Sequence, residues 1–276
     1  MDKINHSNNF IDDEIGETLL ITLYMKSIET RNEKAIIKDY QAVELVDKID
    51  YDFSKFSSAT ITSVGVAIRA KYYDDMLKLF IENSKNPVIV IIGCGLDSRY
   101  NRIGKSANNA KFYQLDIPEV IDIRKKLIKP KENETYISSS MLDTEWIETL
   151  KNENPSGSFL FIIEGVLMYF SKNDVQTVFE RLAMNFSQSE ILFDINNVWM
   201  SKNSHRQDSV KLMRAKFIYG TDNDKEMETW ADNLKFISTK YYTDFNSWNR
   251  LGVKGWIMKL IPRFKKSGRM LHYKII

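Results

Sequence analysis

Two glycines and two carboxylates stand immediately after short apolar runs of the sequence that resemble β-strands. They are Gly93, Gly95, Asp116 and Glu164. In a parallel sheet the carboxyl ends of the strands meet at one edge, and open α/β sheets bind their ligands there. Glycine lets the backbone turn sharply and approach a ligand, while carboxylates accept hydrogen bonds from hydroxyl or amino groups. The pattern therefore predicts a binding site for a small polar cofactor.

Asp116 follows the glycines at the spacing of about twenty residues at which Rossmann-type sites place a carboxylate on a ribose diol. We expect Asp116 to bind a ribose. The alternative is that Asp116 caps a helix beginning at Pro118-Glu119, since Asp followed by Pro is a common helix start. Glycines after a strand are likewise also ordinary turn residues.

Glu164 follows Phe-Ile-Ile, and a carboxylate in such a setting needs a cation or hydrogen-bond donors nearby. The amino group of a methionine-type cofactor is one such cation. The alternative is an ion pair with Arg69 or Arg99. Ser98 stands where the dinucleotide fingerprint would place a third glycine, which weakens a pyrophosphate-binding interpretation. The glycines, Asp116 and Glu164 distinguish cofactors only partly, because nicotinamide enzymes use the same crevice, but the missing third glycine argues against a nicotinamide cofactor.

A sheet of alternating strands and helices is needed to bring these residues together. The expected strands are 88–92, 111–115, 135–138, 159–163, 190–193, 234–241 and 270–276, with helices at 118–127, 144–150 and 173–185. Strands that alternate with helices imply parallel pairing. The last strand closes the chain with no helix after it, so an antiparallel final hairpin is the simplest arrangement. We predict an α/β fold with a doubly wound, mostly parallel, seven-stranded sheet.

The chain is interpreted as a single domain with four parts. Residues 1–84 form an N-terminal helical cap, 85–194 the cofactor-binding core, 195–232 a polar and helical lid insertion, and 233–276 the C-terminal strands. The substrate pocket is expected between the N-terminal helices and a group of aromatic residues of the insertion. These are Trp199, Phe217, Tyr219 and Trp230.

Composition excludes several other classes of protein. The 39 Lys and Arg nearly balance the 37 Asp and Glu, so the net charge of +2 does not attract the whole molecule to nucleic acid or membrane. The lone Cys94 cannot form an internal disulfide, the N-terminal segment is polar, and the apolar runs are too short to span a bilayer. The three histidines are scattered, so no metal site is expected. These features predict a cytoplasmic protein that acts on a small molecule.

Five motifs, in order, resemble the leucine carboxyl methyltransferase family, especially its bacterial branch of small-molecule, polyketide-type O-methyltransferases. They are Asp52-Phe53-Ser54-Lys55-Phe56, Ala67-Ile68-Arg69, Gly93-Cys94-Gly95-Leu96-Asp97-Ser98-Arg99, Leu115-Asp116-Ile117-Pro118-Glu119-Val120 and Glu164-Gly165-Val166-Leu167-Met168-Tyr169. The resemblance implies a Rossmann-like class I methyltransferase fold and S-adenosylmethionine as the cofactor.

The resemblance also implies a role for each motif. Arg69 would hold the cofactor carboxylate, the Gly93-Cys94-Gly95 turn would approach the methionine part, Asp116 would hold the ribose, and Glu164 the amino group. An N-terminal basic residue also lines the cofactor in relatives. Lys26 is the nearest match here, and a helix-surface lysine is the alternative for it.

One motif departs from the family pattern. Relatives often place Asp-Leu beside the adenine, where this chain has Ser140-Met141 ahead of Asp143. Adenine would then contact Met141 and Ser140, or Asp143 would replace the missing carboxylate.

The catalytic group is not marked by the sequence. An acceptor carboxylate is already ionised, whereas a hydroxyl needs a base to take its proton. Tyr169 lies close enough to the site to orient an acceptor, with a packed core tyrosine as the alternative.

We predict an O-methyltransferase acting on a hydroxyl or carboxylate. The competing classes are a nicotinamide-dependent oxidoreductase and a non-catalytic binding module that retains the fold.

Overall fold

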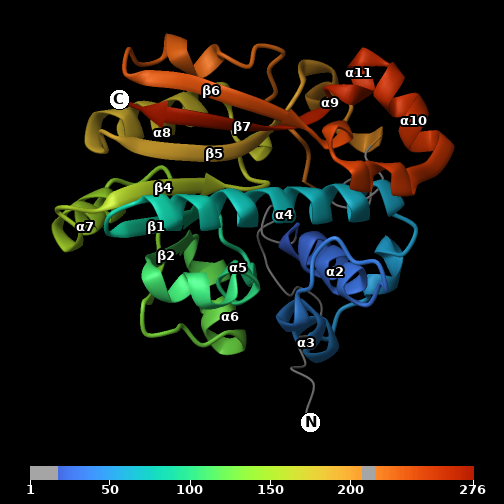
Figure 1. Cartoon of the computed structure of the whole chain (residues 1–276), viewed down its shortest axis with the longest axis horizontal. Coiled ribbons are helices and arrows are strands. Elements are labelled where there is room, and N and C mark those ends of the chain that lie inside the picture. The colour runs from blue at the N-terminus through green and yellow to red at the C-terminus, as the bar shows by residue number, and fades with distance from the viewer. Residues whose placement is uncertain (1–17, 207–214) are drawn as a thin grey trace.

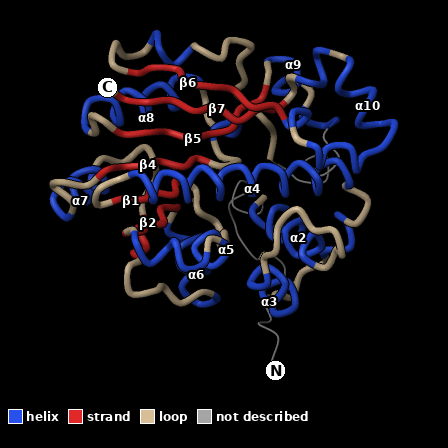
Figure 2. The backbone as a smooth tube through the Cα atoms, viewed as in Figure 1, coloured by secondary structure: helices blue, strands red, loops and turns tan. Residues whose placement is uncertain are grey.

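A seven-stranded sheet forms the centre of the computed structural model, which describes residues 18–206 and 215–276 (Figures 1 and 2). The strand order is β3-β2-β1-β4-β5-β7-β6. The strands are β1 Pro87–Ile92, β2 Lys111–Asp116, β3 Glu134–Ser138, β4 Ser158–Ile163, β5 Ser189–Asn196, β6 Leu234–Tyr241 and β7 Gly268–Ile275. The first five pair in parallel, while β7 pairs antiparallel with both β5 and β6. This arrangement confirms the predicted fold class.

Helices cover both faces of the sheet. They are α2 Leu19–Thr30, α3 Tyr40–Lys48, α4 Thr60–Asn83, α5 Arg99–Arg102, α6 Pro118–Leu127, α7 Glu145–Glu153, α8 Lys172–Asn185, α9 Val198–Lys202, α10 Gly252–Leu260 and α11 Pro262–Lys265. Figure 1 shows the long helix α4 running across one face, with α7 and α8 on the other side of the sheet. None of the helices in the described ranges has the length and apolar character that a membrane span requires.

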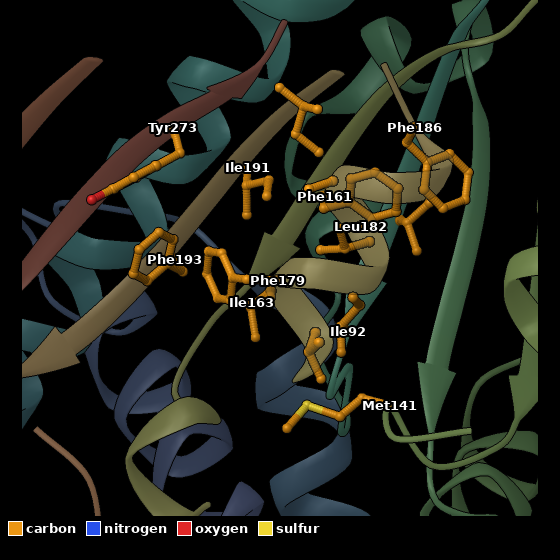
Figure 3. Packing of buried hydrophobic residues seen from close by; sticks show 14 of the residues in the cluster. Ile92, Met141, Phe161, Ile163, Phe179, Leu182, Phe186, Ile191, Phe193 and Tyr273 are labelled. Atoms are coloured by element: carbon orange, nitrogen blue, oxygen red, sulfur yellow. The ribbon is translucent and has the colours of Figure 1, made fainter. Parts of the chain in front are cut away.

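The apolar run of β1 is explained by this double cover, because every residue of the strand is buried. Ile89 and Ile91 pack in a cluster with Ile68 and Leu77 of α4. Side chains on the opposite face belong to a second cluster that includes residues of α7 and α8. Figure 3 shows part of this second cluster, where the aromatic ring of Phe161 meets α8. Strands buried on both faces are characteristic of parallel sheets.

The later part of the chain confirms one expectation and departs from another. The predicted final antiparallel pair is present, with residues 242–267, including α10 and α11, linking β6 to β7. The described residues of the predicted helical insertion, 195–206 and 215–232, hold only α9 and short 3-10 turns, while residues 207–214 lie outside the described part of the chain. Strand β5 continues to Asn196, since it pairs with β7 over its full length, and the five-residue helix α9 follows.

Core packing gives a first prediction. Phe161 is fully buried, and its ring centroid lies 4.9 Å from that of Phe186. Phe161→Ala should lower the free energy of unfolding by about 3–5 kcal/mol, because the vacated volume collapses only partly. Met184 of α8 is 76% exposed, so Met184→Ala is the control. It should change the free energy of unfolding by no more than about 0.5 kcal/mol. Equal effects of the two substitutions on urea unfolding would contradict this packing.

Candidate functional site

A pocket lies at the carboxyl ends of β1, β2 and β4. All nine residues predicted to bind the cofactor line it: Lys26, Arg69, Gly93, Cys94, Gly95, Asp116, Ser140, Met141 and Glu164. They come from α2, α4 and four strand ends, so only the fold brings them together. Figure 1 shows α2 on the side of the sheet toward which β4 points.

The turn after β1 is fixed by steric and hydrogen-bond constraints. Gly93 has a φ of +71°, and a Cβ atom added there would lie 2.2 Å from a side-chain carbon of Val166. The backbone N–H groups of Gly93 and Cys94 both donate to the carbonyl of Leu115, at 2.8 and 3.1 Å. Burial raises the pKa of the Cys94 thiol, so it remains neutral. The turn is therefore a rigid floor for the pocket.

Asp116 connects two loops of the pocket. Its Oδ2 atom accepts a hydrogen bond from the backbone of Gly95 at 2.7 Å, and its Oδ1 atom accepts one from Ile117 at 2.9 Å. The N-cap of α6 is Ile117, without a side-chain cap, so the helix-capping alternative for Asp116 was wrong. A carboxylate has several acceptor sites, so these bonds are compatible with binding a ribose hydroxyl as well.

Arg124 is a positioning residue that the sequence analysis missed. Its side chain is buried on α6 and donates to the backbone carbonyls of Gly95 and Asp97, at 3.0 and 2.9 Å. Glu134 of β3 lies 3.4 Å from the same guanidinium. Arg124 begins an Arg-Lys-Lys run at the end of a helix, where basic residues usually face solvent, so no sequence signal distinguished it.

Glu164 forms ion pairs with both of the arginines considered for it. Arg69 Nε lies 3.0 Å from its Oε1 atom, and a guanidinium nitrogen of Arg99 contacts its Oε2 atom. Burial alone would raise the pKa of Glu164, but Arg69 and Arg99 lower it to about 2. The carboxylate is therefore charged at neutral pH and lies on the wall of the pocket.

Lys26 is buried, so the alternative of a helix-surface lysine was wrong. Its Nζ atom lies 2.6 Å from Oδ1 of Asp97. Asp97 belongs to the motif of residues 93–99, but the sequence did not predict that it lies in the site. Burial acts to raise the pKa of Asp97, but the guanidinium groups of Arg102 and Arg99, with Lys26, hold it well below its usual range. α2 thus supplies a cation to the base of the glycine turn.

These pairs belong to one buried cluster of charges, which we call the ion cluster. It contains Lys26, Arg69, Arg99, Arg102, Asp39, Asp74, Asp97, Glu164 and Asp194. Four cations against five carboxylates leave a formal excess of one negative charge. Within the described chain, Nη1 of Arg99 is a buried donor with no hydrogen-bond partner. An amino acid group, with one carboxylate and one ammonium, fits such a surface.

The region expected beside the adenine is a tight loop. Asp143 accepts a hydrogen bond from the backbone of Ser140 at 2.9 Å, and Ser140 Oγ accepts one from Leu142 at 3.1 Å. Met141 is buried, and Figure 3 places it next to Ile92 at the end of β1. Asp143 is not among the residues lining the pocket, so its observed contacts shape the loop.

A second pocket shares Arg69 with the first pocket. We call it the acceptor pocket. Its walls are largely apolar and aromatic and include Trp199, Phe217, Trp248 and Phe264. Two of the four predicted aromatic residues are elsewhere. Tyr219 and Trp230 pack with the cluster on the α8 face, because the chain beyond Ile218 passes to that side of the sheet.

The acceptor pocket has a polar end that the sequence analysis missed. Asp194 Oδ2 lies 2.8 Å from Arg69, and its Oδ1 atom accepts a bond from the backbone of Gly165 at 2.6 Å. Asn196 lines the same pocket, and its buried Nδ2 atom has no partner among the described residues. Both residues alternate with apolar Ile195, a pattern that could have identified the pocket-facing side of β5.

Tyr169 is placed differently from the nine cofactor-binding candidates. It is buried, it is absent from the lining of both pockets, and its ring packs edge-on against Phe217 at 5.5 Å. Burial raises the pKa of Tyr169 to about 12, against the opposing effects of a hydrogen bond with Thr18 and of Arg69. Tyr169 therefore supports a wall of the acceptor pocket through Phe217.

Comparison with known proteins gives consistent matches. The family model described as Leucine carboxyl methyltransferase matches residues 5–183. The tetracenomycin polyketide synthesis O-methyltransferase TcmP of Streptomyces glaucescens is 25% identical over 268 residues, covering 94% of this chain and 96% of that protein. The S-adenosyl-L-methionine-dependent methyltransferase dpfgK of Gibberella zeae is 25% identical, covering 92% of each.

A solved structure agrees in fold. The crystal structure of a candidate methyltransferase from Thermobifida fusca has a TM-score of 0.60 at 11% identity, covering 96% of this chain and 95% of that one. At this identity the likeness shows the fold alone.

The lowered pKa of Glu164 gives a prediction about acid stability. A carboxylate whose pKa falls from 4.5 to about 2 on folding contributes stability above pH 4.5, and loses it as the pH falls toward 2. The free energy of unfolding, measured by urea titration at several pH values, should therefore decrease over this window. Glu164→Gln should flatten the decrease. Glu148→Gln, at a carboxylate with a 64% exposed side chain, should retain the wild-type slope. Equal slopes for Glu164→Gln and wild type would refute the assignment.

Proposed function

Because the chain belongs to the leucine carboxyl methyltransferase family, it is an S-adenosylmethionine-dependent methyltransferase, and we propose that it methylates an oxygen of a small, largely apolar molecule. The observation that carries the proposal is the position of Arg69, which lies in the wall of both the first pocket and the acceptor pocket. The first pocket would hold the cofactor, and the second would hold the acceptor.

The residues of the first pocket suit each part of the cofactor. Asp116 would accept hydrogen bonds from the ribose, Glu164 would pair with the amino group, and Arg69 with the Arg99 guanidinium would hold the carboxylate. Bound S-adenosylmethionine supplies a methyl group made electrophilic by its positively charged sulfur. The excess negative charge of the ion cluster favours a ligand with a net positive charge, which distinguishes the cofactor from its neutral demethylated product.

The acceptor pocket favours a carboxylate as the oxygen nucleophile. Its polar end presents the guanidinium of Arg69, the amide of Asn196 and the phenol of Tyr242, all of which donate hydrogen bonds. Burial raises the pKa of Tyr242, so the phenol remains a donor. The carboxylate of Asp194 is bonded to Arg69 and Gly165. Donors bind an ionised oxygen, whereas a hydroxyl would need a base.

Catalysis by this chain would then depend on alignment. The apolar walls would exclude water and orient the acceptor skeleton, while Arg69 would fix the boundary between the two reactants. Correct placement of reacting groups can supply a large part of a rate enhancement. The relative TcmP is an O-methyltransferase of tetracenomycin polyketide synthesis, which supports a small organic acceptor here.

Calorimetric titration tests the cofactor site. Asp116→Asn should weaken S-adenosylmethionine binding by about ten- to a hundred-fold, because a hydrogen bond to a charged acceptor is lost. Asp122→Asn, at an exposed position of α6, is the matched control and should bind like wild type. Wild-type affinity in folded Asp116→Asn would refute the ribose assignment. NAD, titrated in parallel, should not bind.

A second test concerns the acceptor oxygen. His205 is the one imidazole in the described lining of the acceptor pocket. If the acceptor is a carboxylate, His205→Gln should change kcat/KM by less than about three-fold, since a general base contributes about a hundred-fold or more. The assay uses radiolabelled methyl transfer to a panel of aromatic carboxylic acids and their hydroxyl analogues. A large loss with His205→Gln, together with transfer to hydroxyls, would show base-assisted chemistry instead.

A further inference from the structure

The positive charge of the chain is concentrated at its C-terminal end. From residue 245 onward there are eight Lys or Arg residues and no Asp or Glu, so the remainder carries 31 basic and 37 acidic residues. Two of the eight pair internally, Arg250 with Glu29 and Arg269 with Asp224. The small net charge of the whole molecule therefore conceals a local basic region.

Five of these cations lie on or directly beside α10 and α11. They are Lys254, Lys259, Arg263, Lys265 and Lys266. No carboxylate in the described part of the chain forms an ion pair with them. Figure 1 shows α10 and α11 at the periphery of the molecule, away from the central strands. This segment thus presents uncompensated positive charge to its surroundings.

The same segment exposes an apolar stripe. Val253, Trp256, Ile257 and Leu260 are 74%, 63%, 46% and 60% exposed. Their spacing of three, four and seven residues places them on one face of α10. Large apolar side chains gathered on one exposed face mark a binding surface more often than scattered ones do.

The stripe is not needed to attach α10 to the rest of the protein. The helix packs through buried Gly255, where an added Cβ would lie 2.8 Å from the Cβ of Leu251. The indole N–H of Trp248 donates to the carbonyl of Gly255 at 3.1 Å, and Met258 packs on the core cluster beneath α4. The inner side of α10 is therefore already satisfied. Val253, Trp256 and Leu260 of the stripe face outward, whereas Ile257 also lines the acceptor pocket.

We infer that α10 and α11 bind an anionic lipid surface. A helix with a tryptophan-containing apolar face flanked by lysines is suited to lie in the interface of a bilayer, with its apolar side chains among the acyl chains and its cations near the phosphates. A second copy of the chain is a poorer occupant, because a symmetric contact would bring two sets of five cations together.

The position of this surface connects it to the acceptor pocket. Lys254, Ile257 and Met258 of α10 and Phe264 of α11 also line that pocket. This step rests on the proposed function: an apolar acceptor would enter its pocket from the lipid surface beside α10. Attachment to lipid itself requires neither cofactor nor acceptor.

Vesicle sedimentation tests the inference. Full-length protein should bind phosphatidylcholine–phosphatidylglycerol vesicles and bind phosphatidylcholine vesicles much more weakly. Combined Val253→Ser, Trp256→Ser and Leu260→Ser should lower partitioning about ten-fold or more, because none of these side chains lines the acceptor pocket but all would enter the bilayer. Met184→Ser, at a 76% exposed apolar side chain on α8, is the matched control and should partition like wild type.

Charge is tested separately. Lys259→Gln with Lys266→Gln should weaken binding to the anionic vesicles about ten-fold or more, and added salt should have the same effect. Calorimetric titration with S-adenosylmethionine checks that each variant is folded.

Several outcomes would overturn the inference: no binding to anionic vesicles, equal binding to neutral ones, or undiminished binding by the triple serine variant. So would a wild-type dimer that the triple variant dissociates in sedimentation velocity, since the stripe would then bind a second copy. Absence of methyl transfer would overturn the proposed function but leave the vesicle result standing.

Discussion

The buried guanidinium of Arg69 is the interaction on which both pockets depend. It lies between Glu164 at the end of β4 and Asp194 near the end of β5, so one side chain joins two neighbouring strands. Burying either carboxylate without this cation would be costly, and removing one member of such a group leaves an uncompensated charge. The position of α4 across the sheet is thereby tied to the geometry of the site.

The N-terminal helices complete this electrostatic arrangement. Lys26 of α2 reaches Asp97, while Asp39 at the start of α3 pairs with Arg102 at 2.8 Å. The helices α2 and α3 thus contribute both signs of charge to the ion cluster. The cap is therefore part of the site and not only a cover for apolar surface.

The sequence predicted the central strands and the gathering of the candidate residues around one pocket, because both rest on local signals. A β-branched run ending in glycine, as at Gly93, can adopt few other structures, and the carboxylates follow strands directly. What could not be predicted depends on long-range contacts. The burial of Arg124 and the contact between Lys26 and Asp97 arise from segments far apart in the chain. The helices α10 and α11 of the β6–β7 connection were not predicted, because antiparallel pairing does not specify what the linking segment contains.

The topology explains why the β6–β7 connection lies beside the acceptor pocket. β7 runs antiparallel to β5 with Asn196 opposite Gly268, so β7 begins where the parallel strands end. Tyr241, the last residue of β6, is paired with Arg269 at the same edge. Any segment inserted between β6 and β7 must therefore emerge over the carboxyl ends of the sheet. Variation in this connection can alter the entrance to the acceptor pocket while leaving the glycine turn and the ion cluster unchanged, because their residues all precede β6 in the chain.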